Sequence, residues 1–116
     1  MISTPVYRSG GISASGTVAG FQQRGVASYY GPGFHGNLTA NGETFDMNAM
    51  TCAHLTLPFD TVLRITNLDN DRHVTVRVND RGPYVGGRII DLSKGAAEEL
   101  GMLEAGIANV LINVIE

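Results

Sequence analysis

The segment from residue 61 to residue 80 reads TVLRITNLDNDRHVTVRVND and contains two stretches rich in β-branched residues. In the second stretch Val74, Val76 and Val78 alternate with polar residues, which is the period of a strand that buries one face. A polar run at 68–72 separates the stretches and is typical of a turn. The segment therefore predicts a β-hairpin over 61–79 whose valines face a core.

Four more short strands are predicted on either side of this hairpin, at 26–30, 51–54, 88–92 and 109–115. Six short strands favour a small closed β-barrel, because closure removes the edges that short strands would otherwise expose.

Two short helical pieces are also predicted. Ser93 is placed to cap a two-turn helix over 94–100, and Gly101 stands where a helix commonly ends. Asp46 is placed to cap a single helical turn that leads into the strand at 51–54. The predicted fold is therefore mostly β, with one or two short helices.

The 116 residues predict a single domain. Residues 1–24 are rich in small, flexible residues without a sustained period, so they are interpreted as a flexible leader, and the domain is predicted at 25–116. The leader is expected to carry little of the stability. The competing expectation is that Ile12, Val18 or Phe21 docks on the barrel.

Several classes of protein are excluded by composition. The formal net charge is −3 and no basic run occurs, which argues against nucleic acid as a partner. Cys52 is the single cysteine, so neither an internal disulfide nor a cysteine-based zinc site can form. No known metal-ligand spacing, phosphate loop or membrane-length apolar stretch is present. No metal and no cofactor are predicted.

Titratable residues gather in two places. Glu43, Asp46 and His54 lie within twelve positions of one another, and Asp80 follows the alternating strand directly. A carboxylate at a strand end is held on a rigid element beside a loop that can approach a ligand. The alternatives are structural: a turn acid at 80, a surface acid at 43, a helix cap at 46 and a core histidine at 54.

The aromatic residues near these positions lie in stretches rich in glycine and proline, which suits flat surfaces for stacking sugars. The alternative is that they belong to the core. These aromatic residues are Tyr29, Tyr30, Phe34 and Tyr84.

Seven motifs together resemble the rare lipoprotein A family of bacteria, and the resemblance runs in order from Gly25 to Glu116. They are GVASYYG at 25–31, TANGETFD at 39–46, AH at 53–54, LPF at 57–59, TNL at 66–68, VNDRGPY at 78–84 and GRIIDLS at 87–93.

The resemblance implies a six-stranded double-psi β-barrel in the periplasm or cell envelope, anchored in a full-length form as an outer-membrane lipoprotein. It implies lytic transglycosylase activity on peptidoglycan glycan strands, cell-division or envelope proteins as partners, and a monomer. The catalytic positions that it implies are Glu43, Asp46, His54 and Asp80. The substrate-binding positions are Tyr29, Tyr30, Thr39, Asn41, Arg81 and Tyr84.

On this hypothesis Asp80 is the general acid, and then the base, for cleavage of the MurNAc-β-1,4-GlcNAc bond to a 1,6-anhydro end. His54 orients Asp80 or contacts the sugar, while Glu43 and Asp46 hold the acid or the substrate. Two alternatives stay open: an expansin-like module that binds polysaccharide without cutting it, and an ordinary hydrolase that uses water as the nucleophile.

Overall fold

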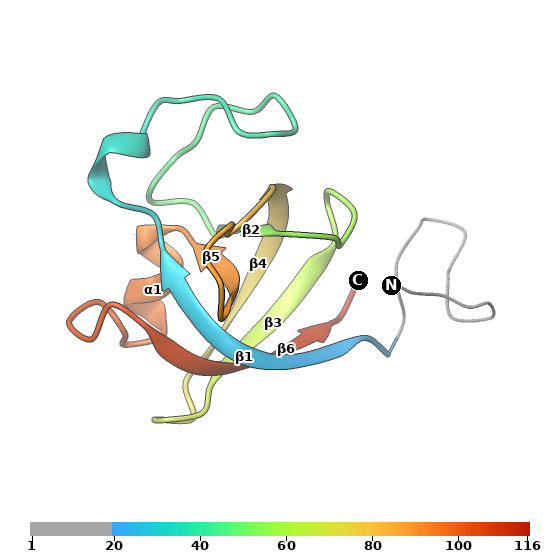
Figure 1. The fold of residues 1–116 in the computed structure, drawn as a ribbon, viewed down its shortest axis with the longest axis vertical. Helices are drawn as coiled ribbons and strands as arrows, with labels where there is room; N and C mark the ends of the chain where they lie inside the picture. The colour runs from blue at the N-terminus through green and yellow to red at the C-terminus, as the bar shows by residue number, and fades with distance from the viewer. Residues whose placement is uncertain (1–19) are drawn as a thin grey trace.

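A computed structural model describes residues 20–116, in which six strands close into one barrel (Figure 1). The strands follow one another around the barrel in the order β1-β5-β2-β4-β3-β6. Their bounds are β1 Gln22–Tyr29, β2 Thr51–His54, β3 Val62–Asn67, β4 His73–Asp80, β5 Arg88–Leu92 and β6 Ala108–Val114. A short α-helix, α1 (Lys94–Glu99), and a 3-10 turn, η2 (Pro32–Phe34), complete the fold.

Parallel pairing distinguishes this barrel from a simple up-and-down one. β1 is parallel to β5 and β2 is parallel to β4, whereas the remaining neighbours are antiparallel. The predicted class is confirmed: the protein is a mostly β, six-stranded double-psi barrel with one short α-helix.

The hairpin predicted from the alternating valines is confirmed as β3 and β4, with Ile65 opposite Val74 and Leu63 opposite Val76. Val76 and Val78 are buried with less than 2% of their surface exposed. β6 contributes Val110 and Ile112 to the same interior. The barrel therefore encloses a core of aliphatic side chains, which fixes the strand register because a slip of one residue would turn these side chains to solvent.

Several details differ from the sequence expectations. β1 begins at Gln22, three residues before the expected domain start at Gly25, because Gln22–Arg24 pair with β6. The helical turn expected after Asp46 is a plain turn, since the side chain of Asp46 accepts a hydrogen bond from the Asn48 N–H two residues on. Ser93 caps α1 as predicted, accepting from the Ala96 N–H at 3.1 Å, but the helix ends at Glu99.

The expectation for the leader falls partly outside the described residues, which exclude 1–19 and with them Ile12 and Val18. Phe21 lies within them, and its ring packs against the core.

A chain that begins at Gly25 is therefore expected to unfold at least about 5 °C below a chain that begins at Gly20, a loss of about 1 kcal/mol or more. It lacks the Phe21 ring and the three ladder pairs of Gln22–Arg24. Thermal unfolding followed by circular dichroism measures the difference. Midpoints within about 2 °C of each other would show that residues 20–24 carry little stability.

Candidate functional site

A groove of about 420 Å³ opens where β1 and β4 end, beneath the long segment that joins β1 to β2. This segment arches over the barrel at the top of Figure 1, in cyan to green. Fourteen residues line the groove: Ser28, Tyr29, Tyr30, Gly31, Phe34, Asn37, Leu38, Asp80, Arg81, Gly82, Pro83, Tyr84, Arg88 and Asp91.

Asp80, the last residue of β4, is held in this groove by three hydrogen bonds. Its Oδ2 accepts from the Tyr30 hydroxyl at 2.5 Å. Its Oδ1 accepts from the backbone N–H of Ala40 at 2.8 Å and from that of Arg81 at 2.9 Å. The carboxylate thus receives donors from three segments of the chain, which fix its orientation toward the groove.

Tyr30 is fixed in turn by two aromatic neighbours. Its ring stacks on Phe45 at a centroid distance of 4.4 Å and meets the edge of Phe34 at 5.6 Å. Burial, together with the hydrogen bond to Asp80, raises the pKa of the Tyr30 hydroxyl far above its ordinary value. The group is therefore a neutral phenol at neutral pH and donates its proton in the hydrogen bond to Asp80.

Arg81 and Tyr84 form part of the groove wall beyond Asp80. The Arg81 guanidinium lies 4.0 Å from the centroid of the Phe59 ring, and its Nη1 donates to the His54 carbonyl at 3.2 Å. Tyr84 is 80% exposed, and Phe34 is 51% exposed. Exposed rings beside a polar cleft offer faces on which a sugar ring can stack.

Glu43 lies outside the groove lining and fastens the arching segment to the barrel. Its two carboxylate oxygens accept from Arg77 on β4 at 2.8 and 2.9 Å, and Asn79 donates to it at 3.1 Å. The Arg77 hydrogen bonds, followed by that of Asn79, lower the pKa of Glu43 to about 2. Glu43 is therefore ionised at neutral pH, and its hydrogen bonds to Arg77 and Asn79 hold the arching segment against β4.

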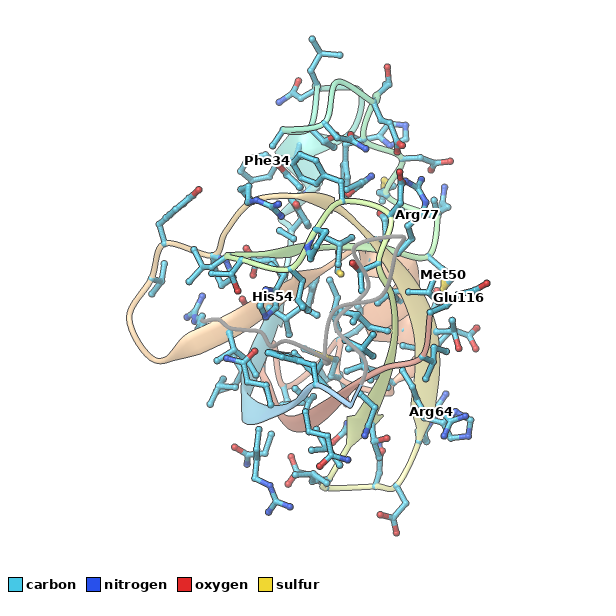
Figure 2. The ribbon with its side chains drawn as sticks, turned by 90° about the vertical axis from the view of Figure 1, so that its right-hand side faces the viewer. Phe34, Met50, His54, Arg64, Arg77 and Glu116 are labelled. Atoms are coloured by element: carbon cyan, nitrogen blue, oxygen red, sulfur yellow. The ribbon has the colours of Figure 1, made fainter. Side chains whose placement is uncertain are left out.

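His54, at the end of β2, is buried with 3% of its surface exposed and also lies outside the groove lining. Its Nε2 faces Gln23 Oε1 at 2.8 Å, and its Nδ1 accepts from the backbone N–H groups of Thr56 and Leu57 at 3.1 Å each. Figure 2 shows His54 in the body of the barrel, below Phe34 in the arching segment. Neither ring nitrogen forms a hydrogen bond with Asp80.

The remaining predicted positions also divide into residues that line the groove and residues that lie outside its lining. Tyr29 lines the groove together with Tyr30, Arg81 and Tyr84. Asp46, Thr39 and Asn41 do not line it. The Thr39 hydroxyl donates to Asn41, and Asn41 donates to Glu43 at 3.0 Å, so both belong to the network that shapes the arching segment.

The sequence prediction missed four polar residues of the groove: Ser28, Asn37, Arg88 and Asp91. Asp91 carried one usable signal, because it is a lone carboxylate inside the otherwise apolar run of Ile89, Ile90 and Leu92. A charged residue in such a run needs a partner or a function.

Within residues 20–116, no group of three or more metal-ligating side chains comes together. No helix in that range is both long and apolar enough to cross a membrane.

Comparison with known sequences gives one consistent result. The sequence model of the family described as lytic transglycolase matches residues 22–112. The endolytic peptidoglycan transglycosylase RlpA of Campylobacter jejuni is 63% identical over 91 residues, which are 78% of this chain and 33% of that protein. RlpA of Vibrio cholerae is 56% identical over 96 residues, which are 83% of this chain and 36% of that protein. The chain thus spans about a third of the length of these curated relatives.

Solved structures share the fold at low sequence identity. A Streptomyces papain inhibitor aligns with a TM-score of 0.67 at 21% identity, covering 84% of this chain and 97% of the inhibitor. The expansin of Clavibacter michiganensis aligns with a TM-score of 0.66 at 21% identity, covering 83% of this chain and 51% of the expansin.

Proposed function

Because the chain belongs to the lytic transglycolase family of double-psi β-barrels, we propose that it cuts the MurNAc-β-1,4-GlcNAc bonds of peptidoglycan and leaves 1,6-anhydroMurNAc ends. Its substrate is the glycan strand with few stem peptides, and its place of action is the cell envelope. The curated relatives named endolytic peptidoglycan transglycosylase support this assignment.

The observation that carries the proposal is the placement of Asp80. Its carboxyl group lies in an open groove with the exposed rings of Tyr84 and Phe34. A glycan strand that stacks on these rings would bring a glycosidic oxygen to a carboxyl group that the protein has already oriented. This is the minimum that cleavage without a metal or cofactor needs.

In the proposed reaction Asp80, in its acid form, gives its proton to the glycosidic oxygen as the bond from that oxygen to C1 of MurNAc breaks. The C6 hydroxyl of the same sugar then attacks C1, and its proton passes to the Asp80 carboxylate. No water is consumed, and the acid is restored. The transition state resembles an oxocarbenium ion and carries positive charge on C1 and the ring oxygen.

The other predicted catalytic residues are proposed to act on this step through Asp80's surroundings. Glu43 fixes the arching segment whose Ala40 N–H donates to Asp80. Asp46 shapes the turn that follows in the same segment. His54 positions Arg81, because the Arg81 guanidinium donates a hydrogen bond to the His54 backbone carbonyl. These three are positioning residues.

Mass spectrometry of the products from purified glycan strands tests the proposal. The expected products end in 1,6-anhydroMurNAc and are one water lighter than hydrolysed fragments, and strands without stem peptides should be cut faster. Reducing ends would identify a hydrolase. Strand binding without products would identify a binding module, because the exposed aromatic residues of the groove suit sugar binding with or without cleavage. Either of these results would overturn the proposal.

A further inference from the structure

Four residues form one continuous row across the barrel wall beneath the groove. Ser28 of β1 pairs with Asp91 of β5, Asp91 pairs with Ala53 of β2, and Ala53 pairs with Asp80 of β4. Register partners in a sheet project their side chains to the same face. The row therefore directs Asp80 and Asp91 to one side of the wall, and both residues line the groove.

The spacing of this row suits a sugar ring. Adjacent strands lie about 4.8 Å apart, so the Cα atoms of Asp80 and Asp91, two strands apart, are separated by roughly 10 Å. Ala53, which lies between them, is 2% exposed and does not line the groove, so the groove contacts the row at the two carboxylates. In glycosidases, two carboxyl groups flank the reacting sugar at separations of about 5–9.5 Å, a range within reach of two such side chains.

Asp91 is the second carboxylate that lines this groove, whereas two of the predicted acids have partners elsewhere. Glu43 is bound to Arg77, and Asp46 accepts from its own turn. Asp91 Oδ1 accepts from the Ser28 hydroxyl, and Ser28 is itself 4% exposed. The buried serine fixes one oxygen of Asp91, while the residue as a whole remains part of the groove lining.

We propose that Asp91 is a catalytic residue that stabilises the oxocarbenium-like transition state by its negative charge, from the same groove as Asp80. This inference rests on the proposed function and adds a second group to its site. Asp80 carries out both proton transfers, and Asp91 neither gains nor loses a proton. A fixed negative charge beside C1 interacts more strongly with the transition state than with the uncharged ground state.

Asp91→Asn is expected to lower kcat by about 10²–10³-fold, as is typical when one charge-stabilising group is removed, with KM little changed. The products should still end in 1,6-anhydroMurNAc, because Asp80 and the C6 hydroxyl are intact.

The control is Asp69→Asn on the β3–β4 turn, which makes the same change of charge far from the groove lining. Parent-like kcat in Asp91→Asn would overturn the inference while the proposed function stands, and so would a shift of its products to reducing ends. Absence of products from the unaltered chain would overturn both. If Asp91→Asn does not fold, Ser28→Ala replaces it: a several-fold fall in kcat with unchanged KM supports the inference, and parent kcat overturns it.

Discussion

Asp80→Asn is expected to lower the rate of glycan cleavage by about 10²–10⁴-fold, the usual loss when a general acid/base is removed. The fold should tolerate the change. The asparagine Oδ1 can still accept from the N–H groups of Ala40 and Arg81, and its amide can donate to the Tyr30 hydroxyl, which then donates elsewhere. The loss should therefore appear in kcat, with strand binding and the thermal midpoint nearly unchanged.

Release of anhydro-ended fragments, measured alongside thermal unfolding and co-sedimentation with insoluble peptidoglycan, checks this expectation. Asp69→Asn again serves as the matched control, because residue 69 lies in an exposed turn. If Asp80→Asn releases these fragments as fast as the unaltered chain, Asp80 is not the general acid.

The second large effect concerns His54 and pH. Burial, with a smaller contribution from the charge of Arg81, lowers the pKa of His54 to about 4. Its Nδ1 accepts two backbone N–H groups, so protonation of the folded state would break both hydrogen bonds. In the unfolded chain the histidine titrates near its ordinary value of about 6.5. The unfolded state therefore takes up a proton first as the pH falls.

The stability that His54 contributes is complete above about pH 6.5 and is lost progressively as the pH falls toward 4, for a total on the order of 3 kcal/mol. Thermal midpoints between pH 7.5 and 4.5 should fall by roughly 10 °C or more. A further loss below about pH 4.5 is expected from Glu43, whose pKa is also lowered in the fold.

Two single histidine substitutions isolate the effect. His54→Gln should flatten the dependence between pH 6.5 and 4.5, even though it lowers the midpoint overall. His73→Gln, at an exposed position, should retain the parent slope. An unaltered chain whose midpoint does not change across this range would contradict the assignment of a buried neutral histidine.

Local patterns predicted much of this fold. The alternating valines gave the β3–β4 hairpin, Ser93 gave the start of α1, and the sequence motifs gave the family and the double-psi barrel. Each of these signals is contained in a short stretch of chain. The start of β1 at Gln22 was missed because its partner, β6, lies some ninety positions away and the strand itself is polar.

Less of the site could be predicted from the sequence, again because pairing between distant strands brings its residues together. Asp80 was noticed because it ends a strand that can be recognised locally. Asp91 joins it only through the pairing of β5 with β2 and of β2 with β4, which no local pattern reveals. Conversely, Glu43 and His54 look like groove residues by type, whereas Arg77 and the backbone around Leu57 occupy their polar atoms.

The pairing of the first strand with the last has a consequence for how the barrel could be attached to other structures. Gln22 lies opposite Asn113, so the chain enters and leaves the barrel side by side. Tyr29, at the groove, lies at the other end of β1, about 23 Å away at the usual rise per residue.

A linker or a further module joined at either end would therefore emerge from the pole remote from the groove. The barrel would be held by the end opposite the groove, so the groove could move across a surface within the reach of the tether. Two such tethers, one from each end, would share a single pivot, so the shorter of the two would set the range of the groove.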